Sequence, residues 1–233
     1  MTLSDELRAV IRAAYPVADQ AAENAFSRGA LREIYPRYLT MLHQIVRSSV
    51  PLMQTTLERL RKMQKRTAAI VEYSDYLARH VDEEAHHDEW LLDDLELIGH
   101  NRLGVTATRP HHEIARLVGA QYYFTLHYNP FSLLGYIAVL EGAPPSSAKI
   151  DRMEASTGYP SDAFRTLRIH SDVDQEHLRE LDLFLDRLVI SKGDRQSILA
   201  NAAFTVAGVA RCIATLAEPN PDEHPLEELA PTH

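Results

Sequence analysis

The most informative stretch of the chain runs from His80 to Trp90 and reads HVDEEAHHDEW. It lies within residues 67–97, where apolar side chains recur with a period of 3.6 residues and predict one continuous helix that ends before Gly99. Glu84 and His87 stand three residues apart. On a helix such a pair projects a carboxylate and an imidazole from one face, and Glu-x-x-His is a building unit of di-iron and di-manganese sites in helical bundles. Alone, the pair is more often a solvated charged face, so the interpretation depends on what other helices supply.

The frame of this pair has to be chosen, because Glu83 and His86 have the same spacing one residue earlier. Leu91 is expected to face the core as part of an apolar stripe. Glu84 and His87 share the face of Leu91 at steps of three and four residues. The Glu84 frame is therefore predicted to point inward.

A second long predicted helix, over about residues 162–190, carries three polar residues on one stripe. His170, Asp174 and His177 recur at i, i+4 and i+7. The stripe continues through Leu181 and is therefore expected to enter the core. A buried aspartate without a metal or a cation beside it would be very costly, so this pattern is a more specific sign of a metal site than the first one.

Glu141 is the expected third source of a carboxylate, because it ends the apolar segment Leu133–Leu140 rather than belonging to a polar stripe. With it, the candidate ligands are three carboxylates and three imidazoles: Glu84, His87, Glu141, His170, Asp174 and His177. This mixture suits iron or manganese better than magnesium, which prefers oxygen ligands alone. His80 and His86 are expected beside the ligands, as hydrogen-bond partners or extra ligands, with His80 expected to orient a ligand rather than bind the metal.

Helix formers dominate the whole chain, and strand-like alternation and hairpin dipeptides are absent, which predicts an all-α fold. We expect helices over about residues 5–14, from 29 onward with a bend at 51, and over 67–97, 111–128, 131–140, 146–158, 162–190 and 194–216. Residues 1–216 are interpreted as one helical domain. Residues 217–233 hold four prolines and five acids and are expected to be a disordered tail.

Composition excludes several classes of protein. The formal charge is −9, from 24 Lys and Arg against 33 Asp and Glu, which argues against nucleic-acid binding. The single Cys212 cannot form an internal disulfide or a cysteine-ligated cluster, and a buried structural thiol is its expected role. The acidic N-terminus does not resemble a secretory signal, and no apolar run approaches the roughly 20 residues that are needed to span a membrane. The expected location is the cytoplasm, without membrane association.

Other residues give weaker signals. His43 could be a haem ligand, but a core or pocket histidine is the better interpretation, because any long amphipathic helix can carry one. Tyr123 and Tyr136 belong to an aromatic-rich part of the chain that could line a substrate pocket, although such residues are more often simply core.

The pattern as a whole resembles the haem-oxygenase-like di-iron oxidases, which share a superfold with thiaminase-II-like and pyrroloquinoline-quinone-synthase-like proteins. The resemblance covers about residues 30–190 and rests on Glu83–Trp90, Asp94-Leu95, Gly99, Leu140–Gly142 and His170–His177. It implies a seven-helix bundle without haem, with iron ligands at the six positions named above. His86 departs from the pattern, since a small residue would be expected there.

The resemblance implies two Fe(II) ions, with manganese as the other candidate metal, and the use of O₂ to oxidise a small organic substrate such as a fatty acid, an amino acid or an amine. It also implies that a homodimer is a reasonable assembly. Two alternatives stay open: a cofactorless oxidase or hydrolase of the same superfold, and a helical scaffold with a degenerate metal site. Fe(II)-dependent O₂ consumption would distinguish the di-iron oxidase from both alternatives.

Overall fold

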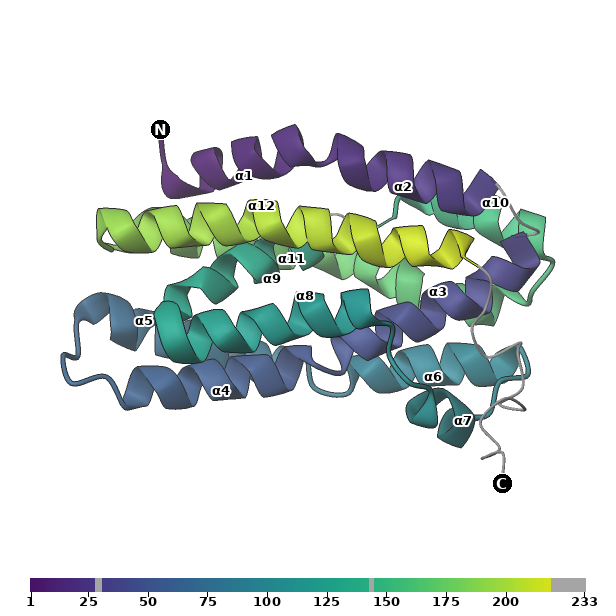
Figure 1. Cartoon of the computed structure of the whole chain (residues 1–233), viewed down its shortest axis with the longest axis horizontal. Helices are drawn as coiled ribbons and strands as arrows, with labels where there is room; N and C mark the ends of the chain where they lie inside the picture. Colours follow the sequence, from purple (N-terminus) through teal and green to yellow (C-terminus); the bar gives the residue numbers. More distant parts are fainter. Residues whose placement is uncertain (28–30, 143–144, 219–233) are drawn as a thin grey trace, which may run out of the picture.

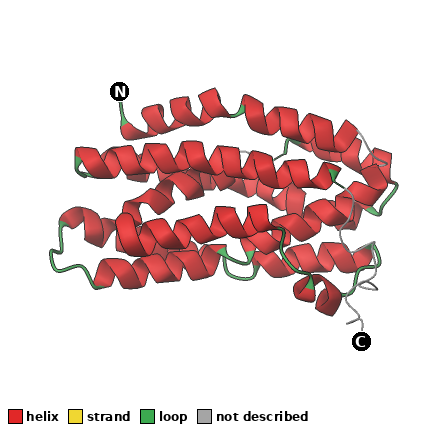
Figure 2. Ribbon diagram, viewed as in Figure 1, coloured by secondary structure: helices red, strands yellow, loops and turns green. Residues whose placement is uncertain are grey.

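The chain folds into helices joined by short turns, and no strand occurs in the part of the chain that the structure describes (Figure 1 and Figure 2). The computed structural model describes residues 1–27, 31–142 and 145–218, with the side chains of residues 172–176 left out. Most of the predicted tail, 219–233, lies outside the described residues. The helices are α1 (Leu3–Ala14), α2 (Pro16–Ser27), α3 (Leu31–Val46), α4 (Ser49–Arg61), α5 (Ala68–Glu83), α6 (His87–Leu97), α7 (Arg102–Ala107), α8 (His112–Tyr123), α9 (Leu133–Leu140), α10 (Ser147–Thr157), α11 (Arg165–Arg187) and α12 (Lys192–Ala214). The all-α prediction is confirmed.

Several helix ends are set by short polar side chains. Thr2 and Asp5 form a capping box at the start of α1, and Ser191 and Asp194 form another at the start of α12. Gly158 ends α10 with a φ of 64°, a conformation in which a residue without Cβ carries no steric penalty. These local signals fix where the helices begin and end before any packing is considered.

Helix α12 is the central helix of the bundle and packs against α1, α2, α8 and α9 (Figure 1). Residues 192–217 form a helix that is long and apolar enough to cross a membrane by length and composition, contrary to the expectation from the sequence. A core helix of a bundle passes the same test, because it too is surrounded by apolar neighbours. Helix α12 contacts four helices of the bundle and is partly buried among them.

The approach of α9 to α12 is close because a glycine lies at the contact. A Cβ placed on Gly135 would overlap the carbonyl oxygen of Ile198 and the amide nitrogen of Ala202. Beside this contact, the Asn201 side chain donates hydrogen bonds of 2.7 Å to the carbonyl oxygen of Ser132 and to the Gln121 side chain. The start of α9 is therefore held against α12 by both packing and buried hydrogen bonds.

The other end of α9 is held by Arg8 of α1. Its guanidinium donates to the carbonyl oxygen of Ala138 over 3.2 Å and pairs with Asp182 of α11 at 2.7 Å. One arginine thus connects α1, α9 and α11 immediately before Glu141. This connection matters because Glu141 is a candidate metal ligand.

Candidate metal centre

The predicted continuous helix over residues 67–97 is wrong, because the chain breaks between α5 and α6. Glu84 is the C-terminal cap of α5, and its amide donates to the carbonyl oxygen of His80. His86 then adopts a φ of 71°, the one positive φ of a non-glycine residue in the described chain. A left-handed residue cannot continue a right-handed helix, so α6 begins anew at His87.

The break still leaves Glu84 and His87 on the buried side. Their side chains are 14% and 9% exposed, and His87 Nδ1 lies 3.1 Å from Glu84 Oε2. Glu83 and His86, the alternative frame, are 42% and 76% exposed. The geometry therefore favours the frame that the apolar stripe indicated, although the two residues belong to consecutive helices rather than to one face of a single helix.

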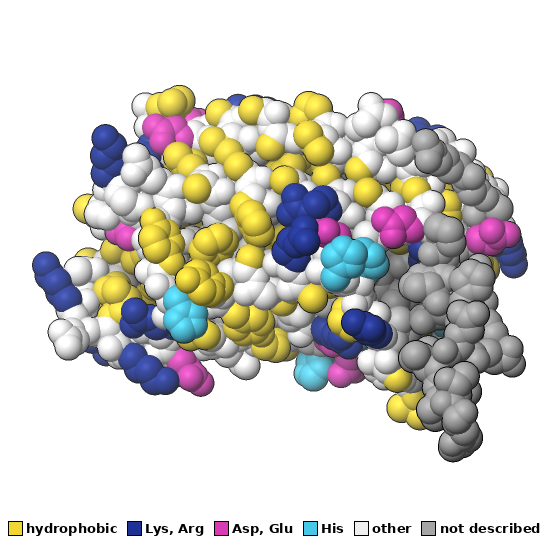
Figure 3. All heavy atoms as spheres, viewed as in Figure 1, with side chains coloured by type: hydrophobic (Ala, Val, Ile, Leu, Met, Phe, Trp, Pro, Cys, Tyr) yellow, Lys and Arg dark blue, Asp and Glu magenta, His cyan; other side chains and the backbone are white. Residues whose placement is uncertain are grey.

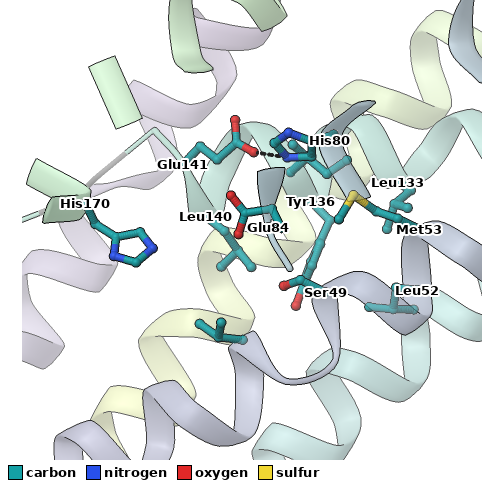
Figure 4. Close-up of a pocket in the computed structure, with 12 residues that line it drawn as sticks. Ser49, Leu52, Met53, His80, Glu84, Leu133, Tyr136, Leu140, Glu141 and His170 are labelled. Atoms are coloured by element: carbon teal, nitrogen blue, oxygen red, sulfur yellow. Dashed lines mark ion pairs between the residues drawn. The ribbon is translucent and has the colours of Figure 1, made fainter. Parts of the chain in front are cut away.

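Helix α9 delivers Glu141 to the same place. Glu141 caps the C-terminus of α9, and its Oε1 atom lies 2.5 Å from His80 Nε2, on the last turn of α5. His80, Glu84 and Glu141 each offer a ligand atom within 4.8 Å of the other two. In Figure 4 these three side chains and His170 lie around one space, and the dashed line joins His80 to Glu141.

Helix α11 supplies two more imidazoles. His170 Nδ1 donates a 2.8 Å hydrogen bond to the carbonyl oxygen of Thr166, which leaves Nε2 free to bind a metal. Its ring centre lies 5.2 Å from that of His87. His177 Nδ1 lies 3.8 Å from Glu84 Oε1. The side chain of Asp174, the third residue predicted on this stripe, is outside the described residues.

Three buried polar atoms of this cluster form no hydrogen bond of good geometry with a described residue, although one of them, His87 Nδ1, lies 3.1 Å from Glu84 Oε2. They are His87 Nδ1, His177 Nδ1 and Glu141 Oε2. Buried polar atoms are normally satisfied, because leaving one unpaired costs about 1–3 kcal/mol. Buried imidazole nitrogens and carboxylate oxygens that lie close together without well-formed hydrogen bonds fit a bound cation.

The charges of the cluster influence one another strongly. Burial by itself would lower the pKa of His80, but the hydrogen bond and the charge of Glu141 outweigh it and raise this pKa to about 9. Burial lowers the pKa of His170, which favours the neutral ring that a metal requires. Burial also acts to raise the pKa of Glu84, but His87 overcomes this and the pKa falls below its ordinary value.

The sequence predicts His80 beside the ligands, and the structure brings it into direct contact with Glu141 and within the three-residue group described above. The signal was present in the sequence, since His80, Glu84 and His87 have the same i, i+4, i+7 spacing as the stripe of α11. Periodicity alone could not separate a ligand from its neighbour. Tyr76 also escaped notice, although its ring stacks on that of His80 with centres 5.5 Å apart.

Two cavities adjoin the cluster. A small one of about 90 Å³ is lined by His80, Glu84, Glu141 and His170 together with Tyr136, which the sequence had suggested as a pocket residue. A larger one of about 380 Å³ extends away from the cluster. The linings of the two cavities share three residues, Val46, Leu140 and His170.

The remaining two predicted pocket residues are not brought to the site. Tyr123 is 63% exposed at the C-terminus of α8. Figure 3 shows hydrophobic side chains gathered on the surface over α8 and α12. His43 is buried in α3, and burial lowers its pKa, but it lines neither cavity. The apolar stripe of a helix shows which residues are buried but not which of them border a cavity.

Comparisons with known proteins agree with this architecture. The sequence pattern of a family described as "iron-containing redox enzyme" matches residues 37–208. The crystal structure of a domain of unknown function with a haem-oxygenase-like fold from Shewanella denitrificans OS217 is similar, with a TM-score of 0.72 and 18% identity over 92% of this chain and 90% of that one. A TenA homolog from Pseudomonas syringae pv. tomato str. DC3000 has a TM-score of 0.60 and 10% identity over 88% and 91% of the two chains. None of the curated proteins compared with the chain matches it. The haem-oxygenase-like fold expected from the sequence is confirmed, and identities this low show a common fold alone.

Proposed function

Because the chain belongs to the family of iron-containing redox enzymes, we propose that it is a non-haem di-iron enzyme that uses O₂ to oxidise a small organic substrate. The observation that supports this proposal is the convergence of buried imidazoles and carboxylates from α5, α6, α9 and α11 on one place. A fatty acid, an amino acid or an amine remains the proposed substrate class at this level.

The residues proposed to hold the two ions are Glu84, His87, Glu141, His170, Asp174 and His177, with His80 beside them as the partner that orients Glu141. Carboxylates and imidazoles together suit iron or manganese, and carboxylates stabilise the more oxidised state of iron. Bound iron would supply the electron transfer to O₂ that protein side chains cannot perform. Asp174 enters this set from its sequence position alone.

The chain's own groups hold the ligands and shape the space beside them. The carbonyl oxygen of Thr166 fixes the ring of His170 so that Nε2 is the free nitrogen. Glu83 lies 3.3 Å from the other ring nitrogen of His80 and orients that imidazole. Leu133, Ile137 and Leu140 line the small cavity and keep water away from a reactive centre.

An anaerobic titration of metal-stripped protein with Fe(II) tests the proposal. We expect two equivalents to bind, followed by O₂ consumption when air is admitted. Glu84→Gln and Glu141→Gln keep the side-chain volume but remove a charge, and each should bind fewer equivalents. His86→Asn is the matched control, because His86 is exposed and asparagine tolerates its left-handed backbone.

Two results would contradict the proposal. If folded wild-type protein bound no Fe(II), the metal centre would be wrong, and a cofactorless enzyme or a scaffold would have to be considered. If His86→Asn lost as much Fe(II) as Glu84→Gln, the inward frame would be wrong. Circular dichroism on every variant shows whether the fold has survived.

A further inference from the structure

The larger cavity has a mostly apolar wall. It lies between α2, α3, α10, α11 and α12, and its volume of about 380 Å³ falls in the range of small-molecule sites, roughly 300–1,000 Å³. Side chains that represent this wall are Phe26, Met41, Ile45, Leu167, Val209 and Ile213. Such a wall favours a ligand with an extended hydrocarbon part.

One end of this cavity meets the metal centre. Val46, Leu140 and His170 line both cavities, so a ligand that fills the larger one reaches the ring of His170. Lys149, in the first turn of α10, lines the larger cavity but not the small one. Figure 1 shows α10 at one end of the bundle. Lys149 therefore borders this cavity outside the part that it shares with the metal centre.

Lys149 is the cationic group of this wall. It is half-buried and forms no ion pair or hydrogen bond through its side chain with any residue that the structure describes. Asp19 is the anionic group of the wall and is exposed to solvent. Tyr38 is neutral near pH 7, because burial raises its pKa to about 12. A partly buried ammonium without a partner favours an anionic ligand more than an exposed, hydrated carboxylate favours a cationic one.

From this arrangement, and resting on the proposed function, we propose that the substrate is an apolar carboxylate whose carboxylate group pairs with Lys149 and whose hydrocarbon end points toward His170. The head group is thus held away from the metal centre. The carbon atoms next to the metal centre are then those of the hydrocarbon end, and the carboxylate is left intact.

Binding of simple probes tests the first half of this proposal without any reaction. The full-length protein is titrated calorimetrically with decanoate, 1-decanol and decylamine at about pH 7. We expect Lys149→Met to weaken decanoate binding by about tenfold or more and to change decanol binding by less than about twofold. Methionine keeps an apolar stem of similar length, so the change removes the charge and little else.

Two variants serve as controls. Lys192→Met removes an exposed lysine at the start of α12 that lines neither cavity, and it should leave decanoate affinity within about twofold. Asp19→Asn should leave decanoate affinity unchanged or raise it. Three results would overturn the proposal: no binding of decanoate, tighter binding of decylamine than of decanoate, or decanoate affinity that Lys149→Met leaves unchanged. A fourth such result would be tighter binding of the zwitterion 2-aminodecanoate, weakened by both Lys149→Met and Asp19→Asn, because it would identify an amino-acid site.

Paramagnetic relaxation tests the orientation. With Mn(II) added to the protein, the terminal methyl protons of decanoate should broaden more than the protons at carbon 2. Greater broadening at carbon 2 would place the carboxylate at the metal and overturn the assigned direction. If Mn(II) broadened neither signal although Lys149-dependent binding persisted, the metal centre of the proposed function would fail while the carboxylate site would stand.

Discussion

His80 Nε2 lies 2.5 Å from Glu141 Oε1, which joins the last turn of α5 to the end of α9. The contact brings together two residues that are distant in sequence, and both side chains are buried. Arg8 holds the end of α9 in place through the carbonyl oxygen of Ala138. Helix packing, rather than a local motif, therefore sets the position of this imidazole next to the proposed ligands.

We expect His80→Gln to weaken Fe(II) binding by about tenfold or more, because it removes a nitrogen that faces both Glu84 and Glu141. His43→Gln is the matched control, since His43 is an equally buried histidine away from the cluster. That control should lower stability without changing Fe(II) affinity. Anaerobic Fe(II) titration measures both variants. Equal affinities for His80→Gln and the wild type would exclude His80 from the centre.

Gly135→Ala should destabilise the protein by about 2–3 kcal/mol, because its methyl group would overlap the backbone of α12. Gly119→Ala, in the middle of α8, is the comparison: nothing lies within 4 Å of its Cβ position, and it should gain about 1 kcal/mol from helix propensity. Urea unfolding measures both. A Gly135→Ala variant as stable as the wild type would show that α9 and α12 are not in close contact.

The left-handed backbone at His86 predicts an order of stabilities. His86→Gly should be more stable than His86→Val by roughly 1–2 kcal/mol, because glycine adopts a positive φ freely and a β-branched residue does not. Thermal unfolding of the two variants gives the difference. If valine were as stable as glycine, α5 and α6 would form one continuous helix, as the sequence alone suggested.

The Cys212 thiol should resist alkylation in the folded protein. Burial raises its pKa to about 12, whereas an exposed thiol in the unfolded chain has a pKa of about 8.5. Between these values the unfolded state loses the proton and the folded state keeps it. This group therefore contributes stability that is complete below about pH 8.5 and declines as the pH rises toward 12.

The rate of alkylation by iodoacetamide near pH 8 measures how well the fold protects the Cys212 thiol. The folded protein should react far more slowly than the same protein in urea, and Cys212→Ala should lessen the loss of stability between pH 8.5 and 10. Rapid labelling of the folded protein would show that the thiol is accessible, contrary to its complete burial in α12.

Removing residues 219–233 should leave metal binding intact. Arg37 already holds the end of the described chain, since it donates hydrogen bonds of 3.1 Å to the carbonyl oxygens of Thr215 and Leu216. The truncated protein should bind the same number of Fe(II) equivalents with an unfolding midpoint close to that of the full chain. A truncated protein that lost its iron would assign the tail a role in the centre.

The sequence by itself determined the helical class and the inward direction of His170 and His177, because burial on a helix follows a period of 3.6 residues, which is a local property. The same reasoning indicated the inward frame of Glu84 and His87, although the chain breaks between these two residues at His86. Glu141 was found in a similar way, as a lone acid at the end of an apolar segment.

Only the tertiary structure decided that the chain breaks at His86, that His80 contacts Glu141, and that a cavity with Lys149 on its wall extends from His170. Contacts elsewhere in the fold offset the energetic cost of a positive φ at a histidine, so no local sequence pattern predicts it. The distance between two helix ends, and the space left between helices, depend on the packing of residues far apart in sequence. A periodicity read along a single helix contains no information about either.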